Sequence, residues 1–198
     1  MKASPSNAAK TVPSPMPFLS DVTELRRRAR DHIENGAVTP GYMADKEVVL
    51  NLLNDALATE LVCVLRYRRH YFMADGLLAE AIKKEFLVHS TEEQAHADKI
   101  AERIVQLGGE PDFDPKGLLS RSHSEYVPGE SLESMIKEDL IAERVAIESY
   151  REMINYLENR DHTTRRLFEG ILAVEEEHAE ELSSMLKNVK GVSRSELK

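Results

Sequence analysis

Cysteine and tryptophan are almost missing from this chain. Its 198 residues include a single cysteine, Cys63, and no tryptophan. One cysteine excludes an internal disulfide framework and any zinc or iron–sulfur site that needs several cysteine ligands. The expected location is therefore the reducing cytoplasm, and we interpret Cys63 as a small buried apolar side chain.

Long hydrophobic runs are missing too. No apolar run approaches the roughly 18 residues that span a bilayer. The first eighteen residues, MKASPSNAAKTVPSPMPF, lack the hydrophobic centre of a secretory signal. The sequence therefore predicts a soluble protein without a membrane partner.

Positive charge is in deficit. The chain has 26 Lys and Arg residues against 35 Asp and Glu residues, which gives a formal net charge of -9. This balance disfavours a surface built to bind nucleic acid and suits a cationic partner such as metal ions.

Glycine is sparse, whereas helix formers such as Ala, Leu, Glu, Arg and Lys dominate. We therefore expect an all-α fold with one domain. Residues 1–19 carry four prolines and predict a flexible tail, and residues 20–44 predict a short extra helix with a linker.

A four-helix bundle is expected over residues 45–190, followed by a tail over residues 191–198. Its four helices are predicted over residues 46–74, 78–107, 132–158 and 164–190. About twenty residues without periodicity separate the second helix from the third, which suits one long crossover along the bundle.

Each of these helices carries an apolar stripe with gaps of three and four residues. Each stripe also has a carboxylate where a leucine is expected: Glu60, Glu93, Glu143 and Glu175. Buried carboxylates cost free energy unless they are paired or bound to metal, so four of them in matching places indicate a shared partner.

The four carboxylates are expected at one level of the bundle. Helices joined by a tight turn run antiparallel, so residues equally far from the turn lie side by side. The first two glutamates lie 16 residues before and 17 residues after Gly76, and the other two lie 17 before and 15 after Arg160. Because a helical residue rises about 1.5 Å, all four fall in one layer.

Two histidines complete the set. His96 and His178 each follow a stripe glutamate by three residues, as E-x-x-H. A Glu from each of two helices plus E-x-x-H from each of two others is the pattern of ferritin-like di-iron and di-manganese carboxylate proteins. The predicted metal ligands, and the predicted catalytic residues, are Glu60, Glu93, His96, Glu143, Glu175 and His178.

Four carboxylates and two neutral imidazoles carry a charge of -4, which two divalent cations neutralise. These oxygen and nitrogen ligands suit two Fe ions per subunit, with Mn or Zn as alternatives. By symmetry we assign Glu93 and Glu175 as bridges between the ions. One ion is then assigned to Glu60 with His96, and the other to Glu143 with His178.

Several neighbouring residues have less specific patterns. Tyr67 and Tyr150 each follow a stripe glutamate by seven residues. Either tyrosine is a donor to a carboxylate or an electron source, but we favour a core tyrosine with a satisfied hydroxyl. His89, one turn before Glu93, is interpreted as a packed or supporting histidine rather than a seventh ligand. We expect Glu176, Glu177, Glu180 and Glu181 to face solvent. No partner pattern is found for His32, His70, His123 and His162.

At the ligand positions the chain resembles bacterioferritins and the bacterioferritin-like or Dps-like mini-ferritins, over about residues 46–190. The stretches that carry the resemblance are LNDALATELVCVLRY, EEQAHADKIAERIVQLGGEP, EDLIAERVAIESYREMI and LAVEEEHAEEL. The resemblance implies a ferroxidase centre that oxidises Fe(II) with dioxygen or hydrogen peroxide, and a hollow protein shell that stores the ferric mineral.

This chain departs from those families at three places. Haem-binding bacterioferritins have a haem-ligating methionine directly after the first bridging glutamate, where this chain has Gln94, so haem is not expected. Only twenty residues follow His178, too few for the fifth helix of large ferritins, and an extra helix precedes the bundle. These features resemble a cage of twelve subunits more than one of twenty-four. Dps proteins build their iron site between subunits, whereas here all six ligands belong to one bundle.

Two other functions stay open. A dimanganese catalase, or another di-metal oxidase on the same scaffold, would disproportionate peroxide without storing mineral, whereas rubrerythrin is disfavoured because its CxxC pairs are absent. A Dps-type DNA-protecting protein would bind DNA through its tail. That role is disfavoured because phosphate binding needs several cations, and only Lys2 and Lys10 lie within the first nineteen residues.

Overall fold

A computed structural model describes residues 21–76 and 78–195 of the chain. The chain falls into two units, Met1–Pro40 and Gly41–Lys198. Both are helical in their described parts, which confirms the predicted all-α fold. The tail predicted over residues 1–19 lies outside the described residues.

The N-terminal unit contains α1 (Val22–Arg28) and a single 3-10 turn (Ile33–Asn35). The short helix expected within residues 20–44 ends at Arg28, before His32. That histidine adopts a left-handed conformation with φ of 53°, which an α-helix does not accommodate.

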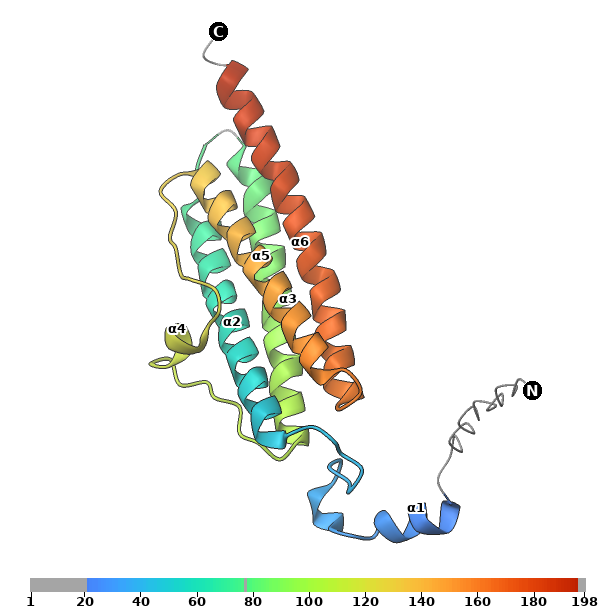
Figure 1. The fold of residues 1–198 in the computed structure, drawn as a ribbon. Helices are drawn as coiled ribbons and strands as arrows, with labels where there is room; N and C mark the ends of the chain where they lie inside the picture. Colours follow the sequence, from blue (N-terminus) through green and yellow to red (C-terminus); the bar gives the residue numbers. More distant parts are fainter. Residues whose placement is uncertain (1–20, 77, 196–198) are drawn as a thin grey trace, which may run out of the picture. The chain divides into compact units, whose positions relative to one another are not determined.

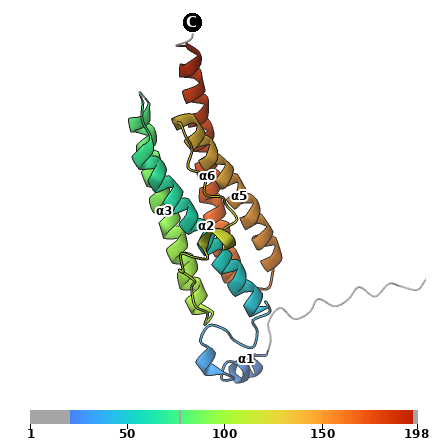
Figure 2. The same ribbon diagram turned by 90° about the vertical axis from the view of Figure 1, so that its left-hand side faces the viewer.

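The second unit is a bundle of four long helices. They are α2 (Lys46–Met73), α3 (Ala79–Gln106), α5 (Leu132–Leu157) and α6 (His162–Ser195). Figures 1 and 2 show α2 running beside α3 and α5 beside α6, and these are the two most extensively packed pairs. The crossover from α3 to α5 runs along the bundle and contains the short helix α4 (Leu118–Arg121), which packs against α2.

Local sequence signals set most of the helix ends. The Asp45 carboxylate caps α2 by accepting from the backbone N–H groups of Glu47 and Val48, at 3.0 and 3.3 Å. The Asp161 carboxylate accepts from Thr164 N–H at 2.9 Å, at the start of α6. However, α6 does not end at residue 190 as expected but continues through Gly191 to Ser195. A single glycine costs a helix only about 1 kcal/mol, which does not stop it.

A buried network of charged side chains binds the crossover between α3 and α5 to the bundle. Arg66 donates to Asp139 at 2.9 Å, and His70 lies 2.7 Å from the other oxygen of that carboxylate. Arg66 also donates to the carbonyl oxygen of Glu125, while His70 contacts that of Pro128, each at 2.9 Å. His70, for which the sequence shows no partner pattern, therefore has two partners in the structure. Its partners lie 58 and 69 residues away, beyond the reach of any local pattern.

One helix, α2, is long and apolar enough to span a bilayer by length and composition alone, although polar residues interrupt its apolar runs. Half of its apolar window is buried inside the bundle. Its inward face carries Leu53, Leu57 and Tyr67, which are fully buried. Burial in the bundle core accounts for the apolar composition of α2. The expected burial of Cys63 is confirmed, at 2% exposure.

Candidate metal centre

The six residues singled out by the sequence meet in the middle of the bundle. Glu60 lies on α2, Glu143 on α5, and the two E-x-x-H pairs on α3 and α6. Each of the six is at most 2% exposed. All six side chains thus lie at the level expected from the turn spacings, while their role as metal ligands stays a prediction.

These side chains form two groups that overlap. One group contains Glu60 and His96, the other contains Glu143 and His178, and both contain Glu93 and Glu175. Within each group the potential ligand atoms lie within 4.8 Å of one another. Two carboxylates thus belong to both groups, the arrangement expected of bridging ligands.

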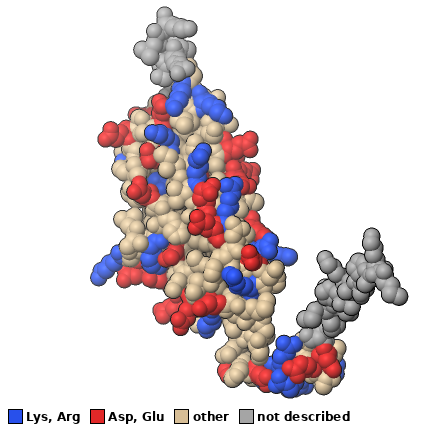
Figure 3. Space-filling model, in the orientation of Figure 1, with Lys and Arg blue, Asp and Glu red and all other residues tan. Residues whose placement is uncertain are grey.

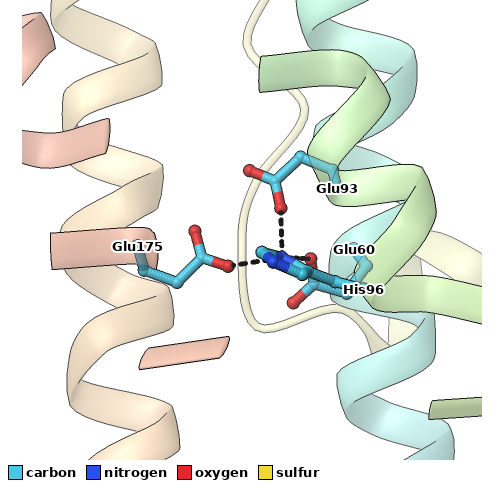
Figure 4. A group of neighbouring side chains, drawn as sticks. All are labelled: Glu60, Glu93, His96 and Glu175. Atoms are coloured by element: carbon cyan, nitrogen blue, oxygen red, sulfur yellow. Dashed lines mark hydrogen bonds and ion pairs between the residues drawn. The ribbon is translucent and has the colours of Figure 1, made fainter. Parts of the chain in front are cut away.

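Figure 4 shows the first group, with the His96 ring between three carboxylates from α2, α3 and α6. Its Nδ1 atom lies 3.0 Å from an oxygen of Glu175, 3.3 Å from one of Glu93 and 3.5 Å from one of Glu60. In the second group, Nδ1 of His178 lies 3.5 Å from Glu93 and 3.6 Å from Glu175. Both imidazoles therefore turn the same nitrogen toward the carboxylates.

Many polar atoms of this centre have no hydrogen-bond partner. In the described part of the chain, seven buried side-chain atoms are unsatisfied, and all but Arg28 Nε belong to the centre. They are Oε2 of Glu60, Oε1 of Glu93, Oε2 of Glu143, both carboxylate oxygens of Glu175 and Nδ1 of His178. Buried polar atoms are normally paired, so an orphaned set of oxygen and nitrogen donors fits divalent metal ions.

The electrostatics of the centre follow from its burial. Burial raises the pKa of Glu60 and Glu143 well above the usual value, and the charges of Glu93 and Glu175 raise it further. Burial alone would also raise the pKa of Glu93, but the nearby imidazoles of His178 and His96 outweigh it and hold this pKa below its usual range.

Histidine protonation responds to the same carboxylates. Burial would lower the pKa of both imidazoles, but their carboxylate partners, Glu175 foremost, raise it to about 12 for His96 and about 10 for His178. Without a metal, protons therefore offset the buried carboxylate charge. Cations bound here would replace those protons.

Two tyrosines donate hydrogen bonds across the bundle to Glu60 and Glu143, the glutamates that each belong to one ligand group only. The Tyr67 hydroxyl on α2 donates to Glu143 on α5, and the Tyr150 hydroxyl on α5 donates to Glu60 on α2. From the sequence we favoured core tyrosines with satisfied hydroxyls over donors to a carboxylate. The structure combines the two roles: both tyrosines are buried, at 0% and 2% exposure, and each hydroxyl is satisfied by a carboxylate.

Three further contacts surround the rings of His178 and His89, and the sequence did not predict the partners in them. An oxygen of Glu92 lies 2.8 Å from Nε2 of His178, and this hydrogen bond fixes the direction of that ring. His89 stacks on the His178 ring, with centroids 4.0 Å apart. It also lies 2.8 Å from Glu181, which is therefore only partly solvent-facing, with its side chain 44% exposed. The first of these contacts joins residues 86 positions apart, and no local spacing around Glu92 indicates it.

Comparison with known proteins identifies the fold. The model of the ferritin-like domain matches residues 50–192. The chain belongs to the ferritin-like family. This confirms the predicted resemblance, and the four helices that supply the centre are the ones this ferritin-like domain covers.

Two relatives in sequence are similar over most of their length. The bacterioferritin of Desulfovibrio desulfuricans is 30% identical over 73% of this ferritin-like chain and 79% of the relative. The DNA protection during starvation protein of Pyrococcus furiosus is 35% identical over 68% of this chain and 74% of the relative.

Among solved structures, the bacterioferritin-related protein of Bacteroides fragilis, described as a dodecameric thioferritin, superposes with a TM-score of 0.75 at 31% identity. It covers 79% of this chain and 94% of its own. Dps from Thermosynechococcus elongatus, at 24% identity, shares the fold with a TM-score of 0.69, over 71% of this chain and 91% of its own.

Proposed function

We propose that this ferritin-like chain is a subunit of an iron-storing cage and carries a di-iron ferroxidase centre inside its own bundle. The observation that supports this most strongly is the pair of overlapping ligand groups that share Glu93 and Glu175. Each Fe(II) ion would have one histidine, one terminal glutamate and the two shared carboxylates as ligands.

The chemistry is the oxidation of Fe(II) as substrate. Two Fe(II) ions give one electron each, and dioxygen takes both electrons with two protons to become hydrogen peroxide. Alternatively, hydrogen peroxide takes the two electrons and two protons to become two water molecules. The protein residues hold the ions side by side, exclude bulk water from the buried centre, and fix the terminal carboxylates through Tyr67 and Tyr150.

Storage requires a shell, and a dodecamer is proposed because the similar Bacteroides fragilis protein is a dodecameric thioferritin. The net charge of -9 would favour the approach of Fe(II). Acidic and basic side chains are interspersed on the face drawn in Figure 3, so attraction would come from the overall charge rather than from one acidic patch on that face. The proposed location is the cytoplasm.

Aerobic addition of Fe(II) to the purified assembly tests this proposal. Rapid growth of ferric absorbance, followed by electron-dense cores in particles of uniform diameter, is the expected result. Glu93→Ala removes a shared carboxylate and should abolish the fast phase, while Glu177→Ala, on the exposed side of α6, should leave it unchanged. Equal oxidation rates in wild type and Glu93→Ala would reject the proposed centre.

A di-metal oxidase such as a dimanganese catalase remains the second candidate, because the same oxygen and nitrogen donors bind manganese. Such an enzyme would evolve dioxygen from hydrogen peroxide and accumulate no mineral. Metal analysis after growth in iron-rich and manganese-rich media, together with a peroxide assay, separates the two functions.

DNA protection is the third candidate, because the similar Pyrococcus furiosus protein is a DNA protection during starvation protein. Residues 21–36 contain four arginines, but also four carboxylates, and the two sets cancel. Arg27 already pairs with Glu24 and Asp31, at 2.9 and 3.1 Å. A gel shift with supercoiled DNA at low salt should therefore show no retardation.

A further inference from the structure

A third group of ligand-type side chains lies beside the centre, between α3 and α6. It consists of Glu85 and His89, one turn apart on α3, and Glu181 on α6. One potential ligand atom from each lies within 4.8 Å of the others. None of the three belongs to the six residues of the proposed di-iron centre.

The His89 ring is held in one orientation. It is fully buried and stacks on the ring of His178, with centroids 4.0 Å apart and 20° between the planes. Its Nδ1 atom lies 3.2 Å from the Tyr67 hydroxyl, and its Nε2 atom lies 2.8 Å from an oxygen of Glu181. The imidazole thus presents Nε2 to the carboxylate of Glu181.

Contacts on both sides of His89 connect this group to the residues of the proposed centre. The Tyr67 hydroxyl, which donates to Glu143, also lies next to Nδ1 of His89. On the opposite edge of the ring, Nε2 faces the Glu181 carboxylate, and a metal ion beside both atoms would replace a proton that they share.

Solvent reaches this group more easily than it reaches the di-iron residues. Glu85 is half-buried, and the side chain of Glu181 is 44% exposed. Glu85 also lines a groove of 280 Å³ between α3 and α6, together with Ile82 and Met185. An ion can therefore approach from water while the rigid His89 supplies a fixed ligand.

We propose that Glu85, His89 and Glu181 form a third binding site for a divalent transition metal, adjacent to the di-iron centre. One imidazole and two carboxylates suit Fe(II) or Zn(II), and their charge of -2 matches one divalent ion. The role of the site rests on the proposed function, because that role is to supply Fe(II) to the di-iron centre. Because His89 stacks on His178, the site would stage Fe(II) next to the centre before oxidation.

Anaerobic titration of the metal-free assembly with Zn(II), followed by calorimetry and metal analysis, tests the third site. Wild type should bind about three ions per subunit, and Glu181→Gln or Glu85→Gln about two. Both glutamates are partly exposed, so these variants should fold, and circular dichroism checks this. Glu180→Gln, one residue away and exposed, is the matched control and should still bind about three.

The two proposals fail in different ways. About two ions in wild type, with no loss in Glu181→Gln, would reject the third site and keep the di-iron centre. About one ion in wild type, lost in Glu181→Gln but kept in Glu93→Ala, would reject the centre and keep the third site. An anomalous difference peak at the zinc edge, within bonding distance of His89 Nε2, would locate the ion directly.

Discussion

Tyr67 on α2 donates its hydroxyl proton to Glu143 on α5, across the bundle from its own helix. The reverse contact, Tyr150 on α5 to Glu60 on α2, makes the centre nearly symmetric, because both halves of the chain repeat the same spacings. His89 breaks that symmetry: the corresponding position on α6, four residues before Glu175, is Ile171. The third group of ligand-type residues therefore exists on one side only.

Replacing Tyr67 with phenylalanine should impair the centre without unfolding the bundle. Glu143 would lose the one donor to Oε1 that the described residues supply, and loss of such a contact to a ligand typically lowers metal affinity or rate by about 10–100-fold. Stopped-flow oxidation of Fe(II) measures the effect. Tyr150→Phe should behave alike, whereas Tyr126→Phe, on the exposed crossover, should match wild type. A wild-type rate in both buried variants would contradict the role given to these hydroxyls.

Glu92 should orient His178 through its hydrogen bond to Nε2. Glu92→Ala is expected to weaken binding at the ion held by His178 by roughly 10-fold or more, and to leave the ion held by His96 less affected. Stepwise Co(II) titration followed by visible absorption would resolve the two ions. Glu102→Ala, exposed on the same helix, is the control. Equal weakening of both ions would show that Glu92 does not act through His178.

Asp161 should make stability depend on pH at the acid end. Burial would raise its pKa, but hydrogen bonds from Thr164, Tyr42 and Arg103 outweigh burial and hold the pKa below its usual value. A depressed carboxyl pKa stabilises the fold above the unfolded pKa of about 3.9, and this contribution is lost as the pH falls through the folded pKa.

The free energies of unfolding of Asp161→Asn and wild type, measured with urea, should therefore become equal in acid. At pH 7 the variant should be less stable by about 3 kcal/mol, because it leaves Arg103 buried without its charge partner. Below about pH 4 the difference should shrink as Asp161 becomes protonated in wild type. A difference that stays constant down to about pH 2 would show that the carboxylate charge is not the cause.

Asp139 should be among the most sensitive positions outside the metal centre. Asp139→Ala leaves the fully buried Arg66 without its charge partner, and such a loss typically lowers the free energy of unfolding by about 3–5 kcal/mol. It should also free the crossover for limited proteolysis, since Arg66 and His70 hold the carbonyl groups of Glu125 and Pro128. Glu148→Ala, which breaks an exposed pair with Arg151, should cost less than about 0.5 kcal/mol.

The layer of glutamates was predictable from sequence because it follows two regular rules. Helical periodicity marks the positions that face the core. In antiparallel helices, residues equally far from the connecting turn lie at the same level, so spacing alone puts the four glutamates in one layer. The bounds of the four long helices followed from the same periodicity within one or two residues, except at the C-terminal end of α6, where the helix continues through Gly191.

Contacts between distant segments were not predictable in this way. The His70–Asp139 pair joins residues 69 positions apart, and nothing in the spacing around either residue indicates the other. Tyr67 and Glu143, 76 positions apart, are a second example. The spacing predicts that the tyrosine lies on the inner face of its helix but does not predict which residue it contacts. Such choices depend on the rotation of each helix about its axis, which is set by packing across the whole bundle.

Diffraction at the iron edge from crystals soaked anaerobically in Fe(II) would decide whether the layer of glutamates is a metal centre. We expect two anomalous peaks within each bundle, one beside Glu60 and His96 and the other beside Glu143 and His178, with Glu93 and Glu175 in contact with both. Bundles without anomalous density at this level, or a single ion that Glu93 and Glu175 do not contact, would contradict the di-iron assignment.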